Sequence, residues 1–209
     1  MPILTPYKDS RNIGRIDPDY VYDKLMNVMR YGNLADPRVY VDEFTQYNLK
    51  VSRAREAFAR VAREYILLGE DARAEELLDR GLEVLPISQL RFTEPNTYPF
   101  IECYYALGLN AKGDALSKAY ITNLIEYIDY YMQFDGKMIA MIENTIYDRL
   151  DELELVYCLA AKYQRDDVVQ TVNRYYRSLG YTDEELILTP QEKEALAQKT
   201  EGEALKVNI

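Results

Sequence analysis

Apolar residues recur at steps of three and four along most of this chain, and the alternation of apolar and polar residues that marks a strand is nearly absent. The pattern therefore predicts an all-α fold. The expected helices cover residues 17–31, 42–68, 70–85, 97–107, 111–132, 142–163 and 165–178. Glycine or proline residues separate most of them, as they do at ordinary helix ends.

Residues 55–88 carry the pattern of a tetratricopeptide repeat, which is a pair of helices about 34 residues long. Small residues such as Ala62 and Gly81 fall where the two helices cross, and Gly69 lies at the turn. A weaker copy covers 94–127, and a degenerate copy covers 150–180, where Gln164 replaces the turn glycine. Because one helix pair cannot bury its own apolar face, we expect the antiparallel pairs to stack as a short right-handed solenoid.

The chain is expected to have three parts: an N-terminal extended segment at 1–16, a helical domain at 17–180 and a polar, acidic tail at 181–209. Asp17 is a helix N-cap residue followed by Pro18, which suits the first helical position. In the tail, Thr182 and Thr189 each precede a glutamate by three residues, which is the arrangement of a capping box. A short helix is predicted near 190–199.

The 209 residues include 35 acids and 25 lysines or arginines, which gives a net charge of −10. Such an acidic chain is a poor partner for nucleic acid or for an anionic membrane surface, because both attract cationic proteins. No apolar run approaches the length of about 18 residues that a membrane-spanning helix needs. The N-terminus also lacks the pattern of a secretory signal. We therefore expect no nucleic-acid partner and no membrane insertion of this chain.

The chain contains no histidine, which excludes histidine-dependent triads, histidine-ligated zinc and imidazole acid–base catalysis. Acids gather at Glu75–Glu76, at Asp151, Glu152 and Glu154, and at Asp166–Asp167. These are interpreted as side chains near helix starts or on exposed helix faces. Cys103 and Cys158 lack metal-site spacing and are interpreted as two small buried residues, with a disulfide open only if the fold brings them together. We expect no catalytic residues, no metal and no cofactor.

Tyrosine is abundant, with 20 residues. Six tyrosines fall on the apolar stripes of predicted helices: Tyr65, Tyr104, Tyr120, Tyr127, Tyr157 and Tyr176. They are interpreted as core residues whose hydroxyl groups reach the surface or a backbone partner.

A different set would line the concave groove of a tetratricopeptide stack and could bind a peptide or a sugar ring: Glu56, Arg63, Ile66, Tyr98, Glu102 and Tyr105. Basic residues are concentrated at Arg53, Arg55, Arg60 and Arg63. Acids intervene among these arginines, so a solvated helix face is the favoured interpretation and a site for acidic peptides is the alternative.

The most specific segment of the sequence is residues 16–43, which read IDPDYVYDKLMNVMRYGNLADPRVYVDE. This segment resembles the start of the soluble C-terminal region in a family of large bacterial membrane proteins, domain of unknown function 2723. The resemblance extends roughly over residues 12–178. It implies a tetratricopeptide-like region on the periplasmic side of the inner membrane, attached to a membrane part that is similar to protein O-mannosyltransferases. The membrane part has no counterpart in this sequence, so the resemblance also implies that the chain is a piece of a longer protein.

These observations together predict a non-catalytic, helical protein–protein interaction or scaffolding module. A protein or peptide partner is expected, and a glycan is the alternative if the groove tyrosines stack on sugar rings. The resemblance implies a periplasmic location, and a free-standing cytoplasmic protein is the alternative.

Overall fold

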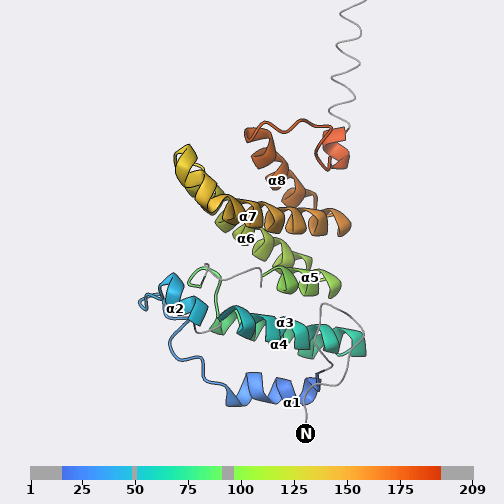
Figure 1. Cartoon of the computed structure of the whole chain (residues 1–209). Coiled ribbons are helices and arrows are strands. Elements are labelled where there is room, and N and C mark those ends of the chain that lie inside the picture. The colour runs from blue at the N-terminus through green and yellow to red at the C-terminus, as the bar shows by residue number, and fades with distance from the viewer. Residues whose placement is uncertain (1–15, 49–50, 91–96, 194–209) are drawn as a thin grey trace, which may run out of the picture. The chain divides into compact units, whose positions relative to one another are not determined.

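The computed structural model describes residues 16–48, 51–90 and 97–193, and within these ranges the chain is helical with no strand (Figure 1). The elements are α1 (Pro18–Asp23), a π-helix η1 (Lys24–Val28), α2 (Glu43–Asn48), α3 (Val51–Leu68), α4 (Asp71–Val84), α5 (Tyr98–Ala106), α6 (Asn110–Tyr131), α7 (Gly136–Lys162) and α8 (Asp166–Ser178). The all-α prediction is confirmed. No helix among the described residues combines the length and apolar character that a membrane crossing requires.

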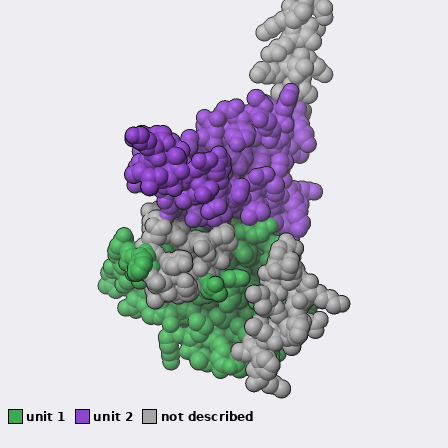
Figure 2. All heavy atoms as spheres, in the orientation of Figure 1, with its two compact units in different colours: residues 1–116 green, residues 117–209 purple. Residues whose placement is uncertain are grey.

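The chain divides into two compact units, residues 1–116 and residues 117–209 (Figure 2). The division falls inside α6. Unit 1 contains α1 to α5 and the first residues of α6, whereas unit 2 contains the rest of α6, α7, α8 and the segment that follows α8.

The core of unit 1 forms where α3 packs against α4 and α5. Gly81 on α4 is essential to this packing, because a Cβ atom at that position would lie 2.9 Å from the Phe100 ring and 3.0 Å from the Phe58 ring. Ala62 and Ala74 are also fully buried. The small residues predicted for the helix crossing therefore do allow close approach of the helices.

The three predicted turns between paired helices share one backbone geometry. Gly69, Gly108 and Gln164 have positive φ angles of 75°, 70° and 55°. The residue after each donates its N–H to the carbonyl five residues earlier, at 2.9 Å for Glu70, 2.9 Å for Leu109 and 2.8 Å for Arg165. This is the hydrogen bond of a Schellman motif, which glycine suits best. Gln164 adopts the same left-handed conformation despite its side chain.

The first helix begins as predicted, because the Asp17 side chain accepts a hydrogen bond from the Tyr20 N–H at 3.1 Å. It ends differently. The chain continues as the π-helix η1, whose wider turn rotates the following side chains away from the α-helical register. Leu25 is buried, but Val28 and Met29 are 52% and 45% exposed. The sequence predicts one apolar stripe made of Val21, Leu25, Val28 and Met29, and this prediction is therefore wrong at Val28 and Met29.

The other helix boundaries agree with the prediction to within a few residues, apart from two regions. The predicted helix at 42–68 appears as α2 and α3, and residues 49–50 lie outside the described ranges. α7 starts earlier than expected, at Gly136, because the Asp135 side chain caps it by accepting hydrogen bonds from the N–H groups of Lys137 (3.2 Å) and Met138 (3.0 Å). The predicted extended segment at 1–16 lies almost wholly outside the described residues.

The start of the tail is attached to unit 2. Both capping boxes form, with Glu185 accepting from the Thr182 N–H at 2.8 Å and Glu192 accepting from the Thr189 N–H at 3.0 Å. The Ile187 N–H donates to the Tyr157 hydroxyl on α7 at 2.5 Å. Residues 190–193 are helical, and the remainder of the short helix predicted at 190–199 lies outside the described residues.

The two cysteines are both free. Cys103 is buried in unit 1, as predicted, and donates weakly to the Ala59 carbonyl at 3.7 Å. Cys158 belongs to unit 2 and is exposed, so the prediction that both are buried is wrong for Cys158.

Candidate functional site

The stripe tyrosines lie in the core, as predicted, except that Tyr127 is only partly buried. Several hydroxyl groups donate to a nearby side chain: Tyr65 to Asp19 at 2.8 Å, Tyr104 to Asp79 at 2.9 Å, Tyr120 to Glu152, and Tyr157 to Asn173. Burial raises the pKa of each of Tyr65, Tyr104 and Tyr157, so these groups stay protonated. These side chains stabilise the fold and are not available to a ligand.

The predicted groove residues have different environments. Arg63 on α3 forms an ion pair with Glu102 on α5, so the structure brings these two residues together. Glu56 is exposed, and Ile66 and Tyr98 are partly exposed.

Tyr105 does not face a groove. Its side chain is buried, its ring lies against Gly113 on α6, and its hydroxyl donates to Asp114 at 3.0 Å. The expectation of an exposed ring at this position is therefore corrected. Tyr105 packs between α5 and the start of α6, where a glycine leaves room for it.

The basic concentration on α3 is not wholly a solvated face. Arg55 is buried, and its Nε donates to the Leu85 carbonyl at 3.0 Å. Leu85 is the C-cap residue of α4, where carbonyl groups lack intrahelical partners and a cation is favourable. Arg55 thus joins the end of α4 to α3, a role that the sequence pattern does not indicate.

Glu152 is also an exception to the expected exposure of the acidic clusters. It is buried in unit 2, where its carboxylate accepts hydrogen bonds from Tyr120 and Arg149. Burial raises the pKa of Glu152, and the bonds from Tyr120 and Arg149 oppose the rise. Its neighbours Asp151 and Glu154 are exposed as predicted.

A cluster around Arg73 attaches α1 to α3 and α4. The Arg73 guanidinium lies 4.8 Å from the Tyr22 ring centroid and 4.7 Å from the Tyr65 ring centroid, and it is 2.7 Å from Asp19. The Tyr22 hydroxyl donates to Glu76 at 2.5 Å. Asp19 and Tyr22 belong to the segment with the family resemblance, and in this structure they hold that segment on unit 1.

Several exposed apolar side chains of unit 2 lie at the end of α6 and the start of α7. We refer to residues 127–141 as the α6–α7 corner. Its exposed side chains are Tyr130 (56%), Met132 (52%), Met138 (47%) and Met141 (82%). The centroid of the Tyr130 ring lies 5.4 Å from that of the Tyr131 ring and 5.3 Å from that of the Phe134 ring. Both pairs are edge to face, so the three rings form one cluster.

Acidic side chains accompany this apolar corner. Asp129, Asp135 and Glu143 lie in or next to it, against one base, Lys137. Asp129 accepts a hydrogen bond from Tyr175 at 2.9 Å, and Asp135 caps α7. The corner therefore combines exposed aromatic and methionine side chains with a negative local charge.

The corner was not predicted from the sequence. A signal was present in the run from Tyr130 to Phe134, which places three aromatic residues and one methionine within five positions beside a turn. One helical stripe cannot bury so many adjacent apolar side chains, because successive residues point in different directions around the helix.

Comparisons with models of protein families, with curated proteins and with solved structures gave no match. The class that fold and surface define is an all-α protein made of packed helices, and the family resemblance of residues 16–43 stays a prediction.

Proposed function

We propose that this chain is a non-catalytic protein-interaction module built from tetratricopeptide-like helix pairs, stacked as the short right-handed solenoid expected from the sequence. The shared Schellman turns at Gly69, Gly108 and Gln164 and the close helix crossing at Gly81 support the repeat. The location beside a membrane glycosyltransferase-like protein, on its periplasmic side, is part of this proposal and depends on the family resemblance.

The exposed α6–α7 corner is the observation that carries the interaction function. Contiguous apolar surface is costly in water, and where a folded protein retains it, the surface commonly binds a partner. Tyrosine is enriched in protein interfaces because its ring offers a large rigid contact, and methionine adapts its shape to different partners. Tyr130, Met138 and Met141 supply these two kinds of contact.

The chemistry of the corner also favours one kind of partner, a protein segment with apolar anchor residues and positive charge. An amphipathic helix that places leucine on one face and lysine on the other meets both requirements, because it matches the apolar side chains and the surrounding acids. The sugar-binding alternative is less favoured, since Tyr105 is buried and only Tyr98 remains of the two predicted groove tyrosines.

Titration with an amphipathic leucine–lysine peptide tests this proposal, with a leucine–glutamate peptide of equal length as the probe of opposite charge. Tyr130→Ser combined with Met138→Ser should weaken binding of the basic peptide about tenfold or more, since each removes an exposed apolar anchor. Leu67→Ser is the matched control, because Leu67 is 75% exposed but lies on α3 in unit 1. Equal binding of the two peptides, or equal weakening by the control, would refute the proposed site.

A further inference from the structure

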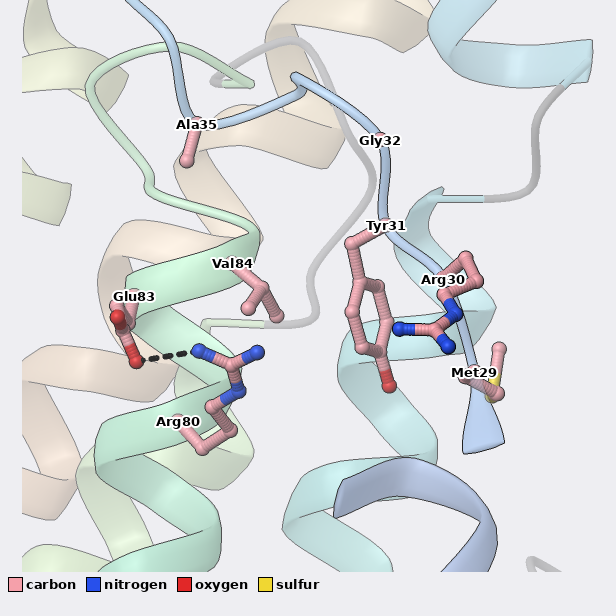
Figure 3. Close-up of a pocket in the computed structure, with 8 residues that line it drawn as sticks. All are labelled: Met29, Arg30, Tyr31, Gly32, Ala35, Arg80, Glu83 and Val84. Carbon is pink, nitrogen blue, oxygen red and sulfur yellow. Dashed lines mark hydrogen bonds and ion pairs between the residues drawn. The ribbon is translucent and has the colours of Figure 1, made fainter. Parts of the chain in front are cut away.

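A separate pocket of about 510 Å³ lies in unit 1 (Figure 3). One side is the segment that follows η1, and the other side is α4. The segment contributes Arg30, Tyr31 and Gly32, and α4 contributes Arg80, Glu83 and Val84. The volume is within the range of small-molecule sites, about 300–1,000 Å³. None of its residues belongs to the α6–α7 corner.

The wall formed by Tyr31 is held in place by the fold. The Tyr31 hydroxyl donates to the Leu25 carbonyl at 2.9 Å, and its ring centroid lies 5.8 Å from that of Phe58. Gly32 follows with a φ angle of +57°, a conformation that glycine adopts without strain. These contacts fix the aromatic wall before any ligand arrives, which reduces the entropy lost on binding.

Two arginines face this pocket from its two sides. In Figure 3 the Arg80 guanidinium points into the space between α4 and the Tyr31 ring, and the Arg30 guanidinium points toward the Tyr31 ring from the other side. Arg80 Nη1 is 2.7 Å from Glu83 Oε2, so this arginine is already balanced by one acid. Among the described residues, no acid forms an ion pair with Arg30. Two arginines and one glutamate give the lining a formal charge of +1, in a chain whose net charge is −10.

We propose that this pocket binds a carboxylate carried on an apolar or aromatic body. A monoanion neutralises the surplus positive charge, whereas a phosphate dianion would leave the lining negative beside Glu83. The planar guanidinium group of Arg30 matches the two oxygen atoms of a carboxylate. Tyr31 and Val84 supply the apolar surface for the rest of the ligand.

Two kinds of ligand carry such a carboxylate: a free small molecule, and a peptide whose C-terminal residue is apolar. The inference concerns unit 1 and does not depend on the proposed docking of a basic segment at unit 2. Either can fail while the other stands.

Binding of 3-phenylpropionate to the whole chain, followed by NMR shifts of the pocket residues, tests the proposal. The neutral amide, 3-phenylpropionamide, should bind about tenfold more weakly, because it lacks the charge-assisted hydrogen bonds. Phenyl phosphate should also bind more weakly than 3-phenylpropionate. Equal binding of acid and amide, tighter binding of the phosphate, or no shift at the pocket would overturn the assignment.

Arg30→Gln should weaken binding of 3-phenylpropionate by a similar factor, and Arg53→Gln should not, because Arg53 is an exposed arginine of unit 1 outside the pocket. Unchanged thermal unfolding of both variants confirms that they fold. Unchanged affinity in Arg30→Gln would contradict the proposal. A short peptide ending in phenylalanine, tested as free acid and as amide, identifies the source: tighter binding of the peptide acid than of 3-phenylpropionate indicates a C-terminus, and weaker binding indicates a free carboxylate.

Discussion

Replacing Gly113 by alanine should destabilise unit 1, although the same change normally stabilises a helix. A Cβ atom at Gly113 would lie 2.4 Å and 2.6 Å from two carbon atoms of the Tyr105 ring, whereas ordinary contacts begin near 3.4 Å. Tyr105 must therefore move by about 1 Å. It is buried and its hydroxyl is bonded to Asp114, so the movement breaks existing contacts. Overpacking of this kind costs about 1–3 kcal/mol.

A helix-propensity gain opposes the cost of this clash. Alanine is better than glycine inside a helix by about 1 kcal/mol. The expected net loss in the free energy of unfolding is therefore up to about 2 kcal/mol. Gly136→Ala is the matched control, because Gly136 is a helical glycine with no neighbouring atom within 4 Å of a Cβ. That substitution should be neutral or stabilising by up to about 1 kcal/mol.

Urea unfolding followed by circular dichroism measures both variants. Tyr105→Leu removes the ring that causes the clash, so Gly113→Ala should cost clearly less in the Tyr105→Leu background than in the native chain. If Gly113→Ala stabilises the chain as much as Gly136→Ala does, the close packing of α5 on α6 is refuted.

Three further predictions concern single side chains. Tyr157→Phe should lower the free energy of unfolding by about 1–3 kcal/mol, because the Ile187 N–H loses its acceptor and Asn173 loses its donor. Unchanged urea unfolding would contradict this. Burial raises the pKa of Glu152, so the folded chain binds its proton more tightly than the unfolded chain does, and Glu152 costs stability as the pH rises above about 4.5. Glu152→Gln should therefore gain stability relative to the native chain between pH 4.5 and pH 7, and a constant difference across this range would argue against the burial. A thiol reagent should modify exposed Cys158 quickly and Cys103 slowly, because burial raises the pKa of Cys103 to about 12; mass spectrometry of the modified peptides checks the order.

The helices were predictable because their signals are local. Periodic apolar residues, the Asp17 cap and the turn glycines all act within a few positions of one another, and the sequence displays them directly. Even the turn at Gln164 was predicted from the repeat, and its φ of 55° agrees with that position.

Residues whose roles depend on distant partners were not predictable. Arg55 and Glu152 have the charges of surface residues, yet both are buried: Arg55 donates to the Leu85 carbonyl, and Glu152 accepts from Tyr120 on another helix. Tyr105 was expected to line a groove, but its ring packs against Gly113, where the missing side chain leaves room for it. The π-helix η1 moves Val28 out of the apolar stripe, and no sequence pattern predicted this change of helical register.

The site was predictable only in part. The groove lined by first helices stays a prediction, although Arg63 and Glu102, two of the residues assigned to it, form an ion pair. The exposed α6–α7 corner was not predicted: Tyr127 falls on the apolar stripe, which favours burial, whereas the exposed Tyr130 lies outside that stripe. Whether such a stripe is covered depends on tertiary packing, which periodicity does not report.

Mapping the binding site of the leucine–lysine peptide tests the central claim most directly. The account predicts that two-dimensional NMR shifts during the titration concentrate in the corner, at residues such as Tyr130, Met132 and Met138. Shifts concentrated on α3 and α5 around Arg63 and Glu102, or spread evenly over the chain, would contradict it.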